Sequence, residues 1–512
     1  MASKKELQHD NVDFLDLSPS PSSLIESLRD IGYSMQTAVA DIIDNSITAR
    51  AKNIHLRFAW NSGSPWLAII DDGHGMNRDE LIRAMRFGSI SPLQQRAKDD
   101  LGRFGLGMKT ASFSQCRLLT VLSKQKDKIT CCEWDLDLIS RSNESRWLLH
   151  VLPNKELKKN KILSELYDEY ISGNSSGTIV IWREIDRIDD GISKSQQESY
   201  LNGLISDSQQ HLELVFHRFL SPDPGHKKLN IYLNNNSLEA FDPFNSRHDT
   251  TVELREETFP CGKDKISTQP FVLPHHNKIS KDEYQKYAGK EGYLQNQGFY
   301  VYRNRRLIIK GTWFRLMKKA ELTKLVRVRV DIPNSLDHLW KIDVKKSNAS
   351  PPESIRNELK RVISRIECSG KKVYEQRGKK LASSIKTPAW ERRAAEGKIY
   401  YEINRKHPLV RQLHDTISSD HGIMLNNLFR MFEGSFPTDL FFSDIASSPE
   451  QLHRPGFEDE QLSRILDDYI DFWGMDDDTT AEQISELMAV DPFSSNKKRT
   501  MKLLEQKGIS HE

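Results

Sequence analysis

The chain has 512 residues, enough for about two to four domains. Its composition, with 37% hydrophobic and 29% charged residues and a net charge of +2, fits packed cores in a soluble protein and argues against a disordered or membrane class. There is no apolar run as long as a membrane span and no apolar signal segment near Met1, so we expect a cytoplasmic protein that does not enter membranes. The cysteines show neither disulfide-framework nor metal-ligand spacing, which predicts reduced thiols at Cys116, Cys131, Cys132, Cys261 and Cys368.

Residues 1–21 are polar and end in Ser-Pro repeats, so we expect a flexible N-terminal arm. An amphipathic helix follows, because at 100° per residue one side gathers apolar residues, namely Met35, Ala38, Val39, Ile42, Ile43 and Ile47. The opposite side gathers polar residues, namely Thr37, Asp41, Asp44, Asn45 and Thr48. A carboxylate four residues before an amide can face one ligand, with the amide oxygen on a hard cation and the carboxylate on a water. The alternative is an ordinary solvated helix face.

Helices alternate with strands from residue 22 to about 182, which predicts a two-layer α/β sandwich with a mixed sheet. The apolar strand signals lie at 54–59, 66–70, 118–123, 130–136, 147–152 and 178–182. The polar, lysine-rich stretch 153–177 is interpreted as an insertion with a helix near 162–171. Residues 187–220 are expected to be helical and to lead out of this domain.

A glycine-containing turn, Asp71-Asp72-Gly73-His74-Gly75-Met76, directly follows the apolar run 66–70. We expect the strand to end at Asp71, and the alternate glycines let the backbone turn sharply close to a flat ligand. A carboxylate at a strand end can accept a hydrogen bond from an exocyclic amine such as that of adenine. By itself the segment also fits an ordinary turn between two elements.

A second glycine-rich segment precedes a helix-permissive stretch and comprises Gly102, Arg103, Phe104, Gly105, Leu106, Gly107, Met108 and Lys109. It is neither a dinucleotide fingerprint, since no βαβ unit surrounds it, nor a Walker loop, since the Gly-Lys-Ser/Thr ending is missing. Amides freed by glycines at a helix start do form a phosphate cradle, and Lys109 adds a cation at the same end.

The order of these three segments resembles the GHKL ATPase superfamily, which includes gyrase B, MutL proteins, heat-shock chaperones, histidine kinases and MORC proteins. The resemblance covers roughly residues 22–350 and implies a Bergerat-type ATPase fold binding ATP and Mg²⁺. By position, it implies that Asn45 binds Mg²⁺, that Asp44 helps to structure the pocket and that Asp71 contacts the adenine amine. Gly73, Gly75 and Met76 would line the base pocket, and Gly102 through Lys109 would form the phosphate lid. A fourth element, Gly177-Thr178 opening a strand, implies that the Thr178 hydroxyl supports the adenine contact.

One position departs from the family pattern. Hydrolysing members usually carry a glutamate general base where this chain has Asp41, which is shorter by one methylene. Because a misplacement of about 1 Å can cost on the order of 100-fold in rate, we expect slow turnover with Asp41 as the base and Asp44 as the reserve candidate.

Residues 221–367 resemble the transducer domain that follows the ATPase domain in the gyrase, MutL and MORC branches. The segment from Gly298 to Ile308 predicts a hairpin with Asn304 and Arg305 at its tip. Transducers supply a lysine that reaches the terminal phosphate, and here Lys345 or Lys346 is the candidate, with no choice made between them. Two exposed lysines at a strand end are the alternative.

Charge is unevenly distributed along the chain. From Phe299 to Lys346 there are thirteen Lys/Arg against four Asp/Glu, and from Met431 to Asp491 sixteen acids face only Arg454 and Arg464. The basic region 299–406 predicts a phosphate-directed DNA contact without sequence specificity, whereas a solvated basic surface is the alternative. Residues 368–512, acidic from about 431, are expected to be mostly helical, with helices near 408–432 and 458–473, and to offer a site for a protein partner.

The predicted fold class is therefore α+β: the ATPase domain at 22–220, the transducer-like domain and the helical C-terminal region. No phosphoaccepting histidine helix precedes Asp41, which argues against a histidine kinase, and the layout is closest to MORC-like ATPases, including prokaryotic restriction and defence proteins. We expect a Mg²⁺-dependent ATPase acting as an ATP-gated homodimeric clamp, on DNA in a defence or DNA-maintenance setting. The rival is a non-hydrolysing, ATP-dependent scaffold or chaperone-like module.

Overall fold

The computed structural model describes residues 20–30, 32–88, 107–141, 146–187, 193–337, 340, 351–366, 387–395, 398–438, 440–441, 456–476 and 479–509. The chain divides into two compact units, one comprising Met1–Ala320 with Lys324–Ile363 and the other Ser364–Glu512 with Glu321–Thr323. Seven of the predicted site residues lie outside the described residues: Gly102, Arg103, Phe104, Gly105, Leu106, Lys345 and Lys346.

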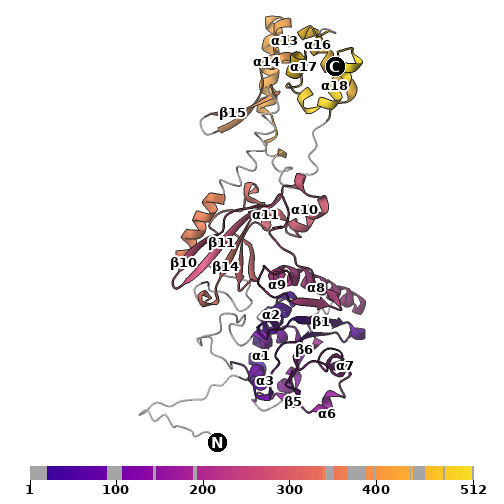
Figure 1. Cartoon of the computed structure of the whole chain (residues 1–512), viewed down its shortest axis with the longest axis vertical. Helices are drawn as coiled ribbons and strands as arrows, with labels where there is room; N and C mark the ends of the chain where they lie inside the picture. The colour runs from indigo at the N-terminus through magenta and orange to yellow at the C-terminus, as the bar shows by residue number, and fades with distance from the viewer. Residues whose placement is uncertain are drawn as a thin grey trace. The chain divides into compact units, whose positions relative to one another are not determined.

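The first unit begins with an eight-stranded mixed sheet of order β5-β4-β3-β6-β2-β1-β7-β8. Its strands are β1 (Asn53–Ala59), β2 (Trp66–Asp71), β3 (Cys116–Gln125), β4 (Lys128–Asp135), β5 (His150–Leu152), β6 (Ser176–Ile185), β7 (Asn230–Leu233) and β8 (Asn236–Ser237). The helices of this part are α1 (Pro21–Arg29), α2 (Met35–Thr48), α3 (Arg78–Met85), α4 (Gly107–Phe113), α5 (Leu136–Arg141), α6 (Asn154–Leu157), α7 (Lys161–Tyr170), α8 (Lys194–Val215) and α9 (His217–Leu220). The predicted alternation of helices and strands is confirmed (Figure 1).

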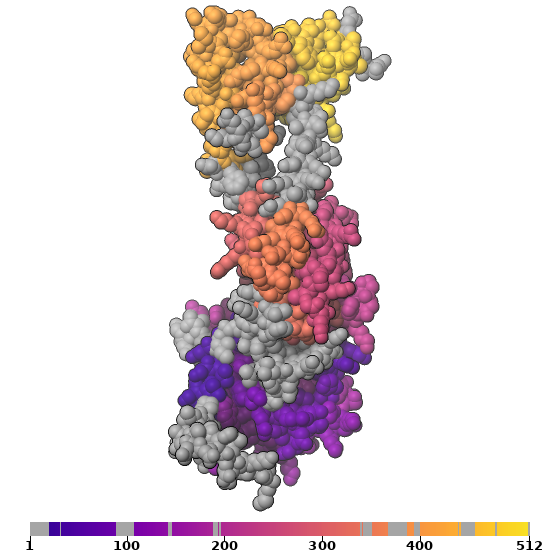
Figure 2. All heavy atoms as spheres, turned by 90° about the vertical axis from the view of Figure 1, so that its left-hand side faces the viewer, coloured from indigo at the N-terminus to yellow at the C-terminus, as the bar shows by residue number. Residues whose placement is uncertain are grey.

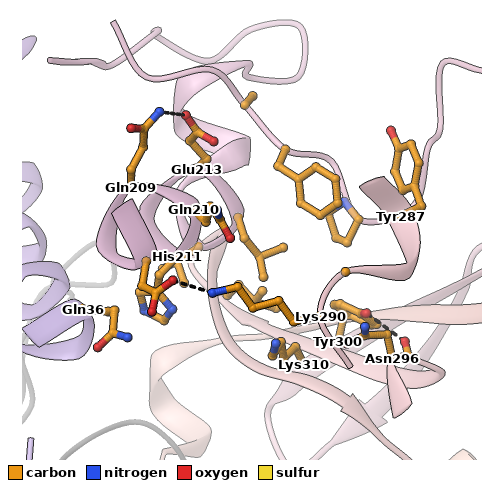
Figure 3. A pocket seen from close by; sticks show the side chains of 18 of the residues that line it. Gln36, Gln209, Gln210, His211, Glu213, Tyr287, Lys290, Asn296, Tyr300 and Lys310 are labelled. Atoms are coloured by element: carbon orange, nitrogen blue, oxygen red, sulfur yellow. Dashed lines mark hydrogen bonds and ion pairs between the residues drawn. The ribbon is translucent and has the colours of Figure 1, made fainter. Parts of the chain in front are cut away.

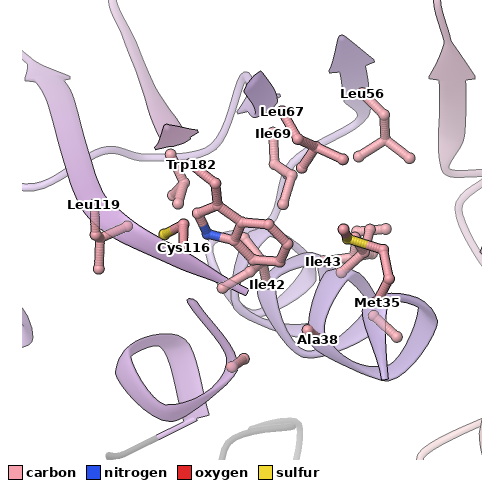
Figure 4. Packing of buried hydrophobic residues seen from close by; sticks show 14 of the residues in the cluster. Met35, Ala38, Ile42, Ile43, Leu56, Leu67, Ile69, Cys116, Leu119 and Trp182 are labelled. Carbon is pink, nitrogen blue, oxygen red and sulfur yellow. The ribbon is translucent and has the colours of Figure 1, made fainter. Parts of the chain in front are cut away.

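The main core of this unit lies between α2 and one face of the sheet. Ile42 and Ile43 of α2 lie toward Leu67 and Ile69 of β2, with Trp182 of β6 beside them (Figure 4). The Trp182 indole is fully buried and donates to Ser112 Oγ at 2.8 Å, so its one polar atom keeps a partner.

The other face of the sheet is covered as well, which the two-layer prediction did not include. Ile179 and Ile181 of β6 pack there with Leu163 and Leu166 of α7. The continuous apolar run in β6 is typical of a strand buried on both faces, because a strand with one solvated face alternates apolar and polar residues. The insertion at 153–177 thus forms a partial third layer.

The sheet also continues beyond the boundary predicted at residue 220. β7 pairs in parallel with β1, from Asn53 opposite Asn230 to Leu56 opposite Leu233, and β8 then pairs with β7. β7 therefore belongs to the first sheet, although the predicted boundary placed residues 221–367 in the next domain. Its hydrogen-bond partner is a strand far earlier in the chain, which the sequence does not reveal.

A second sheet follows in the same unit, of order β10-β11-β14-β12-β13 with β9 beside β11. The part of this unit built on the eight-stranded sheet is called the first domain below, and the part built on this second sheet is called the second domain. Its strands are β9 (Val252–Glu253), β10 (Glu257–Cys261), β11 (Asp264–Val272), β12 (Gly298–Arg303), β13 (Arg306–Thr312) and β14 (Val326–Ile332), and its helices include α10 (Lys281–Ala288) and α11 (Gly292–Gln295). The predicted hairpin is present as β12 and β13. A helix over residues 353–366, with Ile355, Leu359 and Val362 buried, packs on this domain and is orange in Figure 2.

The second unit combines a β-hairpin with helices. Its elements are β15 (Trp390–Ala395), β16 (Lys398–Ile403), α13 (Pro408–Thr416), α14 (Ser419–Gly434), α16 (Asp459–Trp473), α17 (Ala481–Leu487) and α18 (Lys497–Gln506). The helical stretch predicted near 408–432 is present as two helices: Ile417 is extended, with ψ 156°, and Ser418 begins a new helix as its N-cap residue. The β15–β16 hairpin was not predicted. None of the helices in the described part of the chain has the length and apolar composition needed to cross a bilayer.

Candidate nucleotide-binding site

The acidic helix α2 presents its carboxylates inside the protein. Ser34 caps its N-terminus, accepting from the amide of Thr37, and its apolar side packs on the sheet as predicted. Asp41 and Asp44, on the opposite side, are nevertheless 5% and 1% exposed. The solvated-face alternative is therefore wrong for these two residues, whereas Asn45 next to them is exposed.

Asp71 ends β2 as predicted and is held in place by two hydrogen bonds. Its Oδ2 accepts from the Ser46 hydroxyl at 2.8 Å and its Oδ1 accepts from the Gly73 amide at 2.9 Å. Burial raises the pKa of Asp71 to about 6, although these two hydrogen bonds oppose the increase. Because a carboxylate has about four lone-pair sites, this group can still accept a further hydrogen bond from a ligand.

The glycines of the turn are required by the protein's own packing. A Cβ at Gly73 would lie 2.8 Å from Ala49 Cβ, and one at Gly75, where φ is +64°, would lie 1.9 Å from the Lys124 carbonyl oxygen. Both glycines thus bring the turn onto α2 and β3. We predicted that they allow close approach to a flat ligand, but the close approach present here is to the chain itself.

The two adjacent acids of the turn have different roles. Asp72 accepts from the amides of Lys52 and Asn53 and from the Asn53 side chain, so it fixes the start of β1. Only Asp71 is directed toward α2.

Thr178 lies beside Asp71 because β2 and β6 pair with these residues opposite each other. Its hydroxyl is 3.0 Å from the Ser123 hydroxyl, and Ser123 Oγ accepts from the Met76 amide at 2.8 Å. This hydrogen-bonded series links three strands to the end of the glycine turn. Ser46 and Ser123 were both missed in the sequence because isolated serines give no motif signal.

The glycine-rich segment is described only from Gly107 onward, where α4 begins. A Cβ at Gly107 would lie 3.8 Å from Asp41 Oδ2, so the end of the predicted lid lies beside the predicted base. Met108 is partly buried against the main core. Lys109 is almost fully buried: its ammonium donates to the Ala84 carbonyl at 2.7 Å and lies 5.7 Å from the Phe87 ring centre. Burial lowers the pKa of Lys109 to about 8. Lys109 thus ties α4 to α3 in this structure, and its phosphate contact stays a prediction.

Two residues that sequence reasoning missed contact the acids of α2. The Tyr33 hydroxyl donates to Asp41 Oδ2 at 3.0 Å. From the second domain, Arg306 Nε donates to both carboxylate oxygens of Asp44, at 3.2 and 3.0 Å, and its Nη2 is 3.8 Å from Asp41 Oδ1. The sequence does show three arginines close together at the hairpin tip, Arg303, Arg305 and Arg306. Nothing in the sequence, however, indicates which acidic residues they contact.

A cavity of about 1090 Å³ lies close to this contact, between α8 and the second domain. Figure 3 shows Lys290 and Lys310 on the second-domain side and Gln209, Gln210 and His211 of α8 opposite them. Lys290 pairs with Asp207 at 2.6 Å. Burial, with the charges of Arg306 and Lys310 adding to it, lowers the pKa of His211 to about 3, so this imidazole is neutral at physiological pH. Asn45, Asp71 and the glycine turn do not line this cavity.

The donor set of the site fits a magnesium-bound adenine nucleotide. Asn45 offers an exposed amide oxygen beside two carboxylates, the oxygen ligands that Mg²⁺ prefers. Asp71 offers a buried acceptor for an exocyclic amine. The Ser46–Asp71 hydrogen bond and the position of Gly107 bring all three predicted segments together.

Comparison with known proteins points to the superfamily that the motifs resemble. Residues 33–177 match the family described as "Histidine kinase-, DNA gyrase B-, and HSP90-like ATPase". The chain is also similar to a protein named ATPase morc-1 from Caenorhabditis elegans, with 28% identity over 172 residues; the match covers 28% of this chain and 20% of that relative. The chain therefore spans only about a fifth of the length of this relative.

The matched range contains α2, the glycine turn and the end of the lid, and it ends immediately before Thr178. The family match implies ATP binding by this part of the chain. Residues 33–177 of this chain thus match a GHKL-type ATPase domain, and part of the chain is similar to the MORC-named relative.

Proposed function

We propose that the chain is a Mg²⁺-dependent ATPase whose nucleotide closes a clamp between two copies of the chain. The observation that supports ATP binding most strongly is that Asp71 and Gly107 both lie against α2, Asp71 through its hydrogen bond from Ser46 and Gly107 beside Asp41. Such a convergence of acids and freed amides is what binding and hydrolysis of an adenine nucleotide require.

In the proposed site, Asp71 accepts from the adenine amine, with Thr178 supporting this contact, and Gly73, Gly75 and Met76 border the base. Asn45 would hold Mg²⁺, which on binding neutralises phosphate charge. Asp41 orients and deprotonates the attacking water, since it is a buried carboxylate beside the lid end. The lid from Gly102 to Lys109 encloses the phosphates, and Lys345 or Lys346 reaches the terminal phosphate.

The finer proposal is an ATP-gated homodimer that holds DNA through the basic region 299–406, in a restriction, defence or DNA-maintenance setting. Its support is the charge excess of that region and the similarity to a MORC protein. Contact with DNA would be phosphate-directed and would weaken steeply with salt. The C-terminal region, acidic from about 431, is proposed to bind a protein partner.

A non-hydrolysing, ATP-dependent scaffold is the second candidate function. One observation favours it: Asp41 is shorter than the usual glutamate, and both its oxygens already face protein groups, Tyr33 and Arg306. If the carboxylate stays bound to these groups when nucleotide enters, water activation would be slow.

Phosphate release and particle mass together test these proposals. We expect the wild-type chain to release phosphate slowly from Mg²⁺–ATP, and to double its mass by light scattering when a non-hydrolysable ATP analogue replaces buffer. Asp41→Ala is the matched control and is expected to dimerise with ATP without releasing phosphate. A chain that binds the analogue and dimerises but releases no phosphate supports the scaffold, and one that stays monomeric contradicts the clamp. Duplex DNA at low and high salt tests the basic region in the same assay.

A further inference from the structure

The hairpin between β12 and β13 inserts an arginine into the acidic face of α2. Its turn residues Asn304 and Arg305 both have positive φ, 49° and 68°, the geometry of the tight turns that join twisted strands. Arg305 is costly in this conformation, and its guanidinium lies 4.7 Å from the Phe219 ring of α9. This stacking holds the tip of the hairpin against the first domain.

The turn places Arg303 and Arg306 directly opposite each other across the hairpin. Like charges in this arrangement repel unless each has its own counter-ion. Arg303 pairs with Asp337 at 2.8 Å, inside the second domain. Arg306 instead pairs with Asp44 of the first domain, so the hairpin is tied by one arginine to each domain.

The guanidinium of Arg306 is fixed by several contacts. Its side chain is 6% exposed, its Nη1 donates to the Leu307 carbonyl at 2.9 Å, and the Phe216 ring centre is 5.7 Å away. Burying a guanidinium is unfavourable unless it is paired, so the contact with Asp44 and Asp41 must be maintained in this conformation.

Asp41 lies where three parts of the molecule meet. Its Oδ1 faces Arg306 at 3.8 Å, its Oδ2 accepts from Tyr33, and the same Oδ2 is 3.8 Å from the Cβ position of Gly107 at the end of the lid. Asp41 and Asp44 are two buried carboxylates three residues apart on one helix, and Arg306 is a cation placed against both of them.

We infer that Arg306 is a positioning residue for the reaction: it keeps Asp41 oriented, and it makes turnover depend on the hairpin being seated on α2. Arg306 acts through Asp41 and Asp44 and is not assigned a contact with nucleotide. The second domain thereby controls the water-activating group as well as supplying the proposed phosphate-binding lysine. This inference rests on the proposed function.

Arg306→Met removes the charge and keeps the length of the stem. We expect kcat for ATP hydrolysis to fall on the order of 10- to 100-fold, as for a misplaced catalytic group, with KM and the affinity for a non-hydrolysable analogue changed by less than about threefold. Arg306→Lys restores the charge without the planar fork and is expected to recover part of kcat. Lys310→Met is the matched control, since Lys310 also lies on β13 but pairs with Glu291 at 3.3 Å within the second domain, and its kcat should equal that of the wild type.

A purely structural role is distinguished by adding Asp44→Asn to Arg306→Met. In this double variant the side chain at position 44 carries no charge that needs the missing guanidinium, so the melting temperature should recover. The value of kcat should stay low, because Asp41 still lacks its contact with Arg306. Recovery of kcat together with stability would overturn the inference, as would a kcat for Arg306→Met that equals or exceeds the wild-type value. If the wild type hydrolyses no ATP, the proposed function and this inference both fail; if it does and Arg306→Met resembles Lys310→Met, only the inference fails.

Discussion

Asp41→Ala is expected to lower ATP turnover by about 10²- to 10⁴-fold, the usual contribution of a positioned general base, with nucleotide affinity nearly unchanged. The reason is the position of Asp41: it is buried, oriented by Tyr33 and Arg306, and next to the end of the lid. Steady-state phosphate release together with calorimetric binding of a non-hydrolysable analogue measures the two quantities separately.

Asp44→Ala is the comparison that separates the two acids of α2. Asp44 carries the two short contacts to Arg306, so its loss leaves a guanidinium buried without its main partner. Breaking a buried pair in this way costs about 3–5 kcal/mol of folding stability. We therefore expect a marked fall in melting temperature for Asp44→Ala and a much smaller one for Asp41→Ala. Undiminished turnover in Asp41→Ala would remove Asp41 from the mechanism.

Asp71→Asn is expected to weaken ATP binding by about 1.5–3 kcal/mol, roughly 10- to 150-fold, because a hydrogen bond to a charged acceptor is lost inside a buried pocket. The amide also places a donor where Ser46 and Gly73 already donate. Discrimination of ATP from GTP should decrease in the same variant. Asp72→Asn is the matched control, because Asp72 is bonded to the start of β1 and should affect stability without affecting affinity.

The affinity for ATP should also depend on pH through Asp71. Because burial raises the pKa of Asp71 to about 6, binding to the ionised carboxylate must displace a proton below that pH, and affinity falls as the solution becomes more acidic. The ratio of wild-type to Asp71→Asn affinity cancels the titration of the ATP phosphates and should decline toward one below pH 6. A ratio that is constant with pH would contradict this role.

The contribution of Asp71 to folding stability has the opposite pH dependence to its contribution to ATP affinity. The pKa of Asp71 in the folded protein lies above its ordinary value of 3.8, so the folded state holds this proton more tightly than the unfolded state does. The stability that Asp71 contributes is therefore complete below about pH 4 and is lost as the pH rises to about 6. Asp71→Asn should remove this part of the pH dependence.

The sequence was sufficient for features that depend on local periodicity. The 3.6-residue pattern of α2 predicted which side faces the sheet, and the apolar runs at β2 and β6 predicted strands. Pairings between distant segments could not be predicted in this way, because no local pattern specifies the partner of a strand or helix. The structure alone shows that β7 pairs with β1 and that α7 covers the second face of the sheet.

The same distinction applies to the site. Asp41, Asp44, Asn45 and Asp71 were predicted because motif spacing brings them to notice. Arg306 was not, since it lies 262 residues from Asp44 and its role is apparent only from the contact. The solvated-face alternative is excluded for Asp41 and Asp44 by their burial, and Arg306, from much later in the sequence, contacts both.

Calorimetric titration of ATP into wild-type protein and Asn45→Ala, each with Mg²⁺ and with excess chelator, tests the central claim most directly. Asn45 is exposed on α2, so the substitution is expected to leave the fold intact, and Asn45→Asp provides a variant that retains an oxygen ligand. We predict that Mg²⁺ strengthens binding to the wild type and to Asn45→Asp, and that Asn45→Ala loses this magnesium-dependent part. Full magnesium-dependent affinity in Asn45→Ala would contradict the proposed site.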